Sequence, residues 1–268
     1  MTNLLKTVEI IVMCAIIIIV NKIFLLIVYK NIHRQEHMDI NSLSVKIPVA
    51  VVLGILIGVI VIPLSKKLLL SRTEDPAKAA PLEKLVFKVS AIPVAVGCSV
   101  ALMLTAENFG MGLRNVLLLL PIFSLSIIDA LIRKIPNSLL ILMVAIQAVY
   151  LLWYCISNHT TEIIPTVFMG FFVSTIVCLI PSILKIPMGA GDIKYSAVIG
   201  LCIYTSGYFQ AMILMALFVL VYFLYLKIAK KGGMKTQIPM GPFLSLGTVI
   251  TMCFSIFKYI SGLFQNIL

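Results

Sequence analysis

The stretch KIPMGAGDIKYSA, residues 185–197, places an aspartate between two long apolar segments. Pro187, Gly189 and Gly191 come shortly before Asp192. Proline and glycine interrupt helices, so we expect one apolar helix to end before this stretch and another to begin within it. Non-helical backbone at membrane depth is tolerated where protein or a water-filled cavity surrounds it. The stretch therefore predicts a break between helices at which a carboxylate can meet water.

The remainder of the chain is strongly apolar. Of its 268 residues, 61% are hydrophobic and only 12% are charged, whereas soluble domains are about half apolar and a quarter charged. We therefore predict an all-α, polytopic membrane helix bundle with about nine transmembrane helices. The first apolar run is too long for a signal-peptide core and is expected to remain as an anchor. The candidate spans are residues 8–29, 47–64, 89–106, 113–131, 138–157, 163–184, 193–206, 208–226 and 241–260.

The net charge of +11 could suggest nucleic acid as a partner. The basic residues are not interleaved with aromatic residues on a soluble face, however, and they gather at the ends of apolar runs. Lysine and arginine at such positions set orientation in the membrane. We expect a lipid bilayer and no nucleic acid as partner.

The segments between the predicted spans differ in charge. Basic residues dominate 65–88, the Arg133–Lys134 turn, 185–194 and 227–237, whereas 107–112 and 158–162 carry acids or no charge. The positive-inside rule then predicts a cytoplasmic N-terminus and an outer C-terminus. Segment 65–88 is expected to be a turn-rich cytoplasmic loop. Asp129 and Asp192 both fall at the cytoplasmic boundary.

The cysteines and histidines give no sign of a metal site. The six cysteines are scattered singly through apolar runs, which favours packing roles. His33 and His37 have the spacing of a helical metal pair, but no acidic or cysteine partners surround them. His159 falls in a predicted loop. The sequence predicts neither a metal nor a cofactor.

Asp129 lies in the segment LSIIDALIRKIPNSLLI, residues 125–141. Proline disfavours a helical residue before it, so Pro136 should end one helix and Asn137 should begin the next. Alone, Asp129 is equally compatible with a solvated charge at a helix end. Asp192 could likewise be the N-cap of the helix that follows it.

Together the two acids suggest a specific chemistry. Ionisable residues at membrane spans are costly and often functional. Two close carboxylates would share a proton, because both cannot be ionised at low cost. One could then activate water while the other donates a proton to a scissile carbonyl.

In these two segments the chain resembles the prepilin leader peptidases, membrane aspartyl proteases that mature type IV pilins and related pseudopilins. Asp129 to Asn137 matches the first family motif, D-x5-(L/I)-P-(D/N). Residues 188–194, MGAGDIK, match the motif MGxGD(I/V)K. Residues 238–244, IPMGPFL, differ at one position from a third feature, IPFGPFL.

The resemblance implies an intramembrane aspartic endopeptidase that removes the leader of a prepilin or pseudopilin at the cytoplasmic face of a bacterial membrane. It implies Asp129 and Asp192 as the catalytic pair. It also implies a supporting set around them, comprising Gly189, Gly191, Lys194, Pro136, Asn137 and Pro242. Larger relatives carry two CxxC pairs in a cytoplasmic loop and an N-methyltransferase activity, whereas 65–88 has no cysteine. We therefore expect cleavage without methylation.

The predicted organisation has three parts. Residues 1–110 form an N-terminal membrane region with the basic loop 65–88, residues 111–226 form the protease core, and residues 227–268 form a basic cytoplasmic loop and the last helix.

Two alternatives remain open from the sequence. An ion-coupled transporter could use both aspartates as a cation site beside a broken helix, although no inverted repeat is evident. A presenilin-like protease shares the GxGD pattern, but its first aspartate normally follows a tyrosine, and here Ile128 precedes Asp129.

Overall fold

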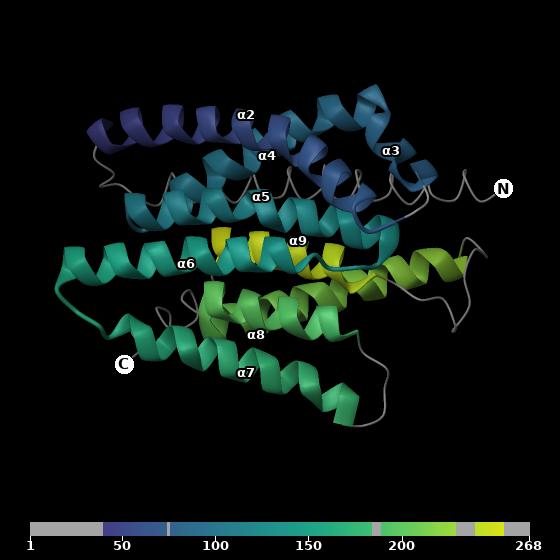
Figure 1. The fold of residues 1–268 in the computed structure, drawn as a ribbon. Coiled ribbons are helices and arrows are strands. Elements are labelled where there is room, and N and C mark those ends of the chain that lie inside the picture. Colours follow the sequence, from purple (N-terminus) through teal and green to yellow (C-terminus); the bar gives the residue numbers. More distant parts are fainter. Residues whose placement is uncertain (1–39, 74–75, 184–188, 229–238, 255–268) are drawn as a thin grey trace. The chain divides into compact units, whose positions relative to one another are not determined.

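A computed structural model describes residues 40–73, 76–183, 189–228 and 239–254, and every regular element in these ranges is a helix (Figure 1). This confirms the all-α prediction. The elements are α2 (Ile40–Leu70), the 3₁₀ helix η1 (Pro76–Ala79), α3 (Ala80–Glu83), α4 (Leu85–Thr105), α5 (Phe109–Ile132), α6 (Asn137–Asn158), α7 (Ile163–Ile183), α8 (Ala190–Ile228) and α9 (Met240–Cys253).

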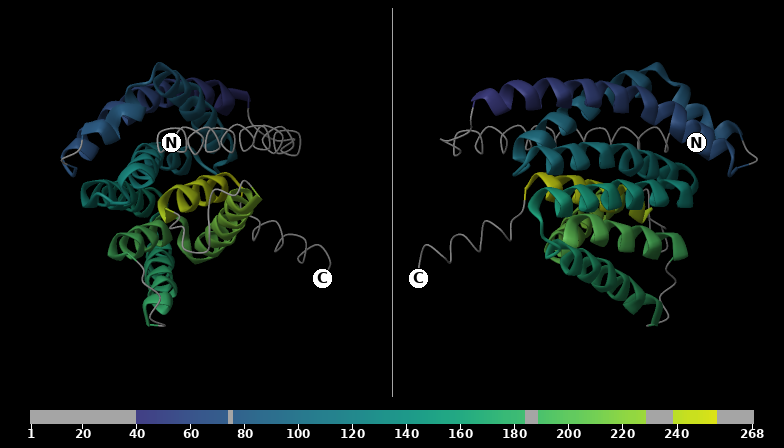
Figure 2. Two further views of the ribbon diagram at one scale, coloured as in Figure 1. Left: turned by 90° about the vertical axis from the view of Figure 1, so that its right-hand side faces the viewer. Right: turned by 60° about the vertical axis from the view of Figure 1, so that its left-hand side comes forward.

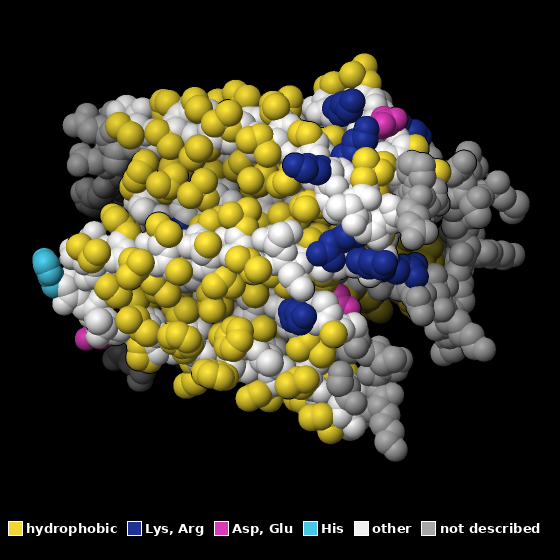
Figure 3. All heavy atoms as spheres, in the orientation of Figure 1, with side chains coloured by type: hydrophobic (Ala, Val, Ile, Leu, Met, Phe, Trp, Pro, Cys, Tyr) yellow, Lys and Arg dark blue, Asp and Glu magenta, His cyan; other side chains and the backbone are white. Residues whose placement is uncertain are grey.

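Six of the described helices are long and apolar enough to cross a membrane, and α9 is a shorter apolar helix. Hydrophobic side chains cover the surface visible along these helices (Figure 3). Leu152 on α6 and Phe172 on α7 are both more than half exposed. Such a surface suits lipid, and the protein is a multi-pass membrane protein. The predicted span 8–29 lies outside the described residues, as do residues 255–260 of the last span.

The chain divides into two compact units, residues 1–120 and 121–268, with the boundary inside α5. In the first unit, α2 packs against α4. Gly54 and Gly58 of α2 lie one turn apart against α4, and a Cβ atom at Gly54 would lie 2.6 Å from the Val96 Cα atom. Small residues allow such close approach between membrane helices. The predicted domain boundaries at 110 and 226 stay predictions.

The expectation of a turn-rich loop over 65–88 is wrong for most of that segment. Helix α2 continues to Leu70, and η1, α3 and the start of α4 occupy much of the rest. Lysine is a good helix former, so the helix extends beyond the end of its apolar run. Lys66 also forms an ion pair of 2.6 Å with Glu83 at the end of α3. That bond and the nearby charge lower the pKa of Glu83.

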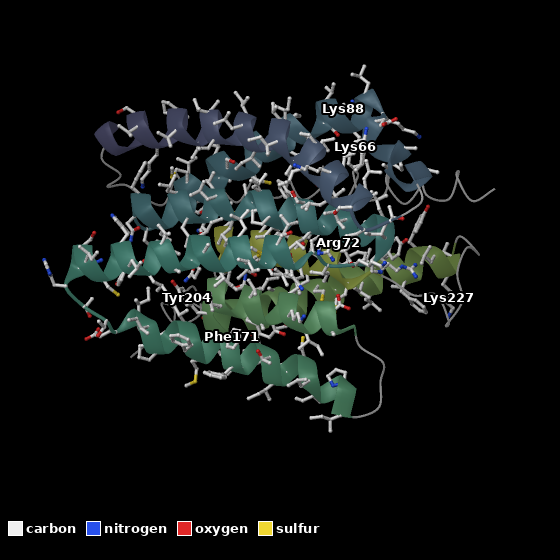
Figure 4. All side chains as sticks on the ribbon, viewed as in Figure 1. Lys66, Arg72, Lys88, Phe171, Tyr204 and Lys227 are labelled. Carbon is white, nitrogen blue, oxygen red and sulfur yellow. The ribbon has the colours of Figure 1, made fainter. Side chains whose placement is uncertain are left out.

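In the second unit, α8 reverses direction near Tyr204, whose backbone has φ 62° and ψ 179°. The Ser196 and Tyr208 hydroxyls are 2.6 Å apart, although a straight helix would separate residues twelve positions apart by about 18 Å. Figure 4 accordingly shows Tyr204 and Lys227 near opposite ends of the second arm. The two arms confirm the predicted pair of helical segments, with the break at 204 instead of 207.

The reversal brings several helix ends of the second unit together. The end of α5, the start of α6, the end of α7 and the starts of α8 and α9 lie at one end of this unit (Figures 1 and 2). Buried polar contacts link α7 to both arms of α8, because Cys178 contacts the Ser196 hydroxyl at 2.9 Å and the Tyr208 hydroxyl at 3.4 Å. These contacts hold α7 and the two arms of α8 together.

Candidate active site

Asp129 lies in the last turn of α5 and is buried, with 4% of its surface exposed. Three residues later the helix ends at Ile132, and Arg133 leaves it with a positive φ of 53°. Pro136 is buried at the N-cap position of α6, and the exposed Asn137 is the first residue of that helix. The predicted helix end is confirmed. The alternative of a solvated charge at position 129 is wrong, because the side chain is buried.

A backbone group from a distant helix holds the Asp129 carboxylate. The Gly241 N–H donates a hydrogen bond of 2.9 Å to Oδ2 of Asp129. Gly241 is the second residue of α9, and the first N–H groups of a helix have no partner within the helix. The positive end of the α9 dipole therefore faces a buried carboxylate, which is a favourable arrangement.

Gly241 approaches Asp129 so closely that no side chain fits between them. A Cβ atom at position 241 would lie 2.6 Å from Oδ2 of Asp129 and 2.9 Å from its Cβ atom. The neighbouring Pro242 is buried and occupies the first turn of α9, where proline is tolerated because its missing N–H would have no helical partner. Pro242 was among the site residues predicted from the sequence, whereas Gly241 was not. The signal was present in the IPMGPFL stretch.

Asp192 lies in the first turn of α8 and is half-buried. Helix α7 ends at Ile183 and α8 begins at Ala190, so the predicted break is confirmed. The expectation that Asp192 caps α8 is wrong: it is the third residue of the helix, and its own N–H already bonds to the Gly189 carbonyl at 3.0 Å. Its charge still lies near the positive end of the helix dipole.

The two aspartate segments meet in the second unit. A Cβ atom at Gly191 would lie 3.2 Å from the Ile135 Cβ atom, so the segment before Asp192 packs against the turn after Asp129. The two carboxylates are close enough for their charges to interact. Residues that are 63 positions apart in the chain are therefore neighbours at one end of the unit.

The remaining predicted residues, Gly189 and Lys194, lie on either side of Asp192 in the sequence, Gly189 just before α8 and Lys194 within it. Gly189 is exposed, and a Cβ atom there would lie 3.0 Å from Oδ2 of Asp192. Lys194 is exposed. Neither residue has a geometry that assigns it a role.

A second buried contact, which was not predicted from the sequence, joins α8 to α9. The Tyr195 and Ser245 hydroxyls are 2.6 Å apart, and both side chains are almost fully buried. Tyr195 also lies close enough to Asp129 for an electrostatic interaction. Tyrosine and serine in an apolar run carry no pattern that would have revealed the pairing.

No group of three or more histidine, cysteine or acidic residues able to hold a metal ion occurs among the described residues. The arrangement consists of two interacting carboxylates, one buried and hydrogen-bonded and one half-buried. Such a pair can carry out acid–base chemistry on a bound amide with water as the nucleophile.

The two aspartates lie in a region that matches a known protein family. Residues 116–226 match the family described as the type IV leader peptidase family. This part of the chain is similar to that family. The match includes both aspartates and ends before α9, so the helix that donates the Gly241 hydrogen bond lies beyond it. No curated protein and no solved structure matches the chain.

The leader peptidase match agrees with the resemblance found in the sequence and supports a leader-peptidase-like protease in the membrane, a class of enzyme that acts on a protein substrate. The transporter alternative receives no support from it.

Proposed function

We propose that this leader peptidase is an intramembrane aspartic endopeptidase that removes leader peptides from type IV prepilin-like or pseudopilin substrates. Asp129 and Asp192 form its catalytic pair. The observation that carries the proposal is the packing of Gly191, next to Asp192, against Ile135 in the turn after Asp129, inside the region matched by the family.

The reaction needs one aspartate ionised and the other protonated. The ionised carboxylate takes a proton from water as the water oxygen bonds to the scissile carbonyl carbon, and the protonated one donates its proton to the carbonyl oxygen. The tetrahedral intermediate then collapses, the C–N bond breaks and a proton passes to the leaving nitrogen. Two close carboxylates suit these reaction steps because such a pair shares a single proton.

We place the reaction at the cytoplasmic face of a bacterial membrane. Three basic positions of the second unit support this orientation: the Arg133–Lys134 turn, Lys194 and Lys227 belong to the helix ends that carry or neighbour the aspartates. The α6–α7 connection, at the opposite end of these helices, carries Glu162. Basic residues favour the cytoplasmic side.

We further propose that the enzyme cleaves without methylating the new N-terminus. Segment 65–88 has no cysteine with which to hold zinc. Glu83 resembles in sequence position an acid that larger relatives use, and here it pairs with Lys66. Purified enzyme given S-adenosylmethionine and a cleaved pilin should transfer no methyl group, and methyl incorporation measured by mass spectrometry would contradict this.

The test of the catalytic pair uses asparagine, which keeps the shape of aspartate but cannot accept or deliver the proton. Asp129→Asn and Asp192→Asn should each abolish cleavage of a co-expressed prepilin, seen as a gel shift in membranes. The double variant should be no worse than either single variant, because members of one catalytic unit are not additive.

Glu162→Gln is the matched control, since it makes the same acid-to-amide change at an exposed position in the α6–α7 connection. It should leave cleavage unchanged. Full processing by either asparagine variant, at a protein level matched to the parent, removes that residue from the mechanism.

A further inference from the structure

The first two turns of α9 contact both helices that carry the aspartates. Gly241 donates its N–H to Asp129 at 2.9 Å. One turn later on α9, the Ser245 hydroxyl meets the Tyr195 hydroxyl at 2.6 Å. Residues four positions apart lie on one face of a helix, so a single face of α9 makes both contacts.

The α8 side of this contact is equally local. Tyr195 follows Asp192 by three positions, and residues with that spacing are neighbours on a helix surface. A hydrogen bond that fixes Tyr195 therefore also fixes the turn that carries Asp192. Both partners are buried, Tyr195 with 1% and Ser245 with 3% of the surface exposed. A buried bond without competing water restricts the helices more than a surface contact would.

We propose that Gly241, Ser245 and Tyr195 are positioning residues, which we call the α9 clasp, and that the clasp sets the geometry of the two aspartates. The proposal rests on the proposed catalytic pair and adds a function for α9, which lies beyond the family match. Gly241 fixes one oxygen of Asp129 and leaves Oδ1 for water or substrate. The Tyr195–Ser245 bond fixes where α8 presents Asp192.

The geometry predicts that the clasp acts on the chemical step and not on substrate binding. Misplacing a catalytic group by about 1 Å can cost about a hundredfold in rate. None of the three clasp groups needs to touch the substrate. Loss of a clasp contact should therefore lower kcat and leave KM unchanged.

The kinetic test uses purified enzyme and a substrate protein with a short basic leader, a glycine and a long apolar helix. Tyr195→Phe and Ser245→Ala should each lower kcat by about tenfold, the order expected for a lost hydrogen bond of this kind. The double variant should equal the singles, since either change removes the same bond. Ser245→Thr restores a hydroxyl and should recover most of the rate.

Tyr208→Phe is the matched control. It removes a hydroxyl from another fully buried tyrosine of α8, whose partners are Ser196 and Cys178. It should leave kcat unchanged per folded molecule. If Tyr195→Phe behaves as Tyr208→Phe does, the clasp is overturned.

A stability measurement tests the Gly241 contact without relying on activity. Gly241→Ala should lower Tm because its Cβ atom meets the Asp129 side chain. Asp129→Gly removes the carboxylate and Cβ atoms that this new Cβ atom would contact. In the Asp129→Gly background, Gly241→Ala should therefore lower Tm little further. Gly247→Ala is the control, since its Cβ atom would lie 2.5 Å from the Ala211 carbonyl oxygen, and its cost should be the same in both backgrounds. If Gly241→Ala lowers Tm equally in the parent and in the Asp129→Gly background, the proposed contact between Gly241 and Asp129 is wrong.

The outcomes separate this inference from the proposed function. If Asp129→Asn still cleaves, the catalytic pair is wrong. If both aspartates are essential but the clasp variants match their controls, the catalytic pair stands and the clasp fails.

Discussion

Each aspartate is held by a helix N-terminus, but in a different way. Asp129 receives an N–H from the first turn of α9, a separate helix, whereas Asp192 sits in the first turn of its own helix, α8. Asp129 is buried and Asp192 is half-buried. A buried carboxylate requires hydrogen bonds, and Gly241 supplies one. Asp192 has the more open position, which fits its proposed role of meeting water and substrate.

A residue-scale prediction concerns Gly191, whose closest neighbour is Ile135. Gly191→Val adds a branched side chain where a Cβ atom alone would lie 3.2 Å from the Ile135 Cβ atom. The change should push the segment before Asp192 away from the turn after Asp129 and lower cleavage by about a hundredfold, as expected for a displacement of about 1 Å. Gly191→Ala should have a smaller effect. Prepilin processing in membranes measures both.

Gly207→Val is the control for this prediction. A Cβ atom at Gly207 would also lie 3.2 Å from an isoleucine Cβ atom, that of Ile203, near the reversal of α8. Equal losses of cleavage in the Gly191 and Gly207 variants would show that the effect reports general misfolding and not the aspartate geometry.

At the scale of elements, the reversal of α8 decides where its second arm goes. The turn residue Tyr204 has backbone angles that are almost confined to glycine. The structure around it must stabilise this conformation. The bond between Ser196 and Tyr208 and the contacts of Cys178 with both hydroxyls lie across the reversal. These buried polar groups thus join α7 to both arms of α8 and maintain the turn.

The backbone conformation of Tyr204 leads to a stability prediction. Tyr204→Gly should be more stable than Tyr204→Ala by about 1–2 kcal/mol, because both remove the ring but only glycine relieves the strain. At Tyr225, in the regular part of α8, the same comparison should be reversed, with glycine less stable than alanine by about 1 kcal/mol. Unfolding of the purified variants measures both differences. An alanine variant at 204 as stable as the glycine variant would refute the strained turn.

At the scale of the whole molecule, apolar surface and charge fit a membrane. The candidate spans carry at most two charges in their most apolar windows. The basic residues Arg72, Lys194 and Lys227 lie outside those windows or at helix ends. Charges at helix ends set orientation in a bilayer, so the sidedness of the active site follows from this pattern as a prediction.

That orientation can be measured by cysteine labelling. In a background without native cysteines, Arg72→Cys and Lys227→Cys should react only when a membrane-impermeant reagent reaches the cytoplasmic side. Thr161→Cys should react only from the outside. All three positions are exposed. Labelling of positions 72 and 161 from the same side would contradict the proposed orientation and the cytoplasmic site.

The sequence alone determined the class of fold and predicted the two acids of the candidate site. Long apolar runs predict membrane helices because hydrophobic length is a property of each segment by itself. Pro136 and the glycines around 190 interrupt helices through local backbone chemistry, so the ends of α5 and α7 were also predictable. Two aspartates with these flanking residues indicated a protease, and the family match bears this out.

Only the tertiary structure decided which groups surround those acids. The Gly241 contact spans 112 positions and the Tyr195–Ser245 contact spans 50, and no local pattern encodes contacts of such range. The reversal of α8 at Tyr204 could not be predicted from the sequence either. The backbone angles of Tyr204 are ones that a tyrosine rarely adopts, so they depend on the packing around it. Most of the described part of segment 65–88 is helical where its prolines suggested turns, since Lys66 reaches its partner Glu83 only after the chain has folded back. Local sequence sets where helices begin and end, whereas the close approach of one helix to another depends on all the side chains packed between them.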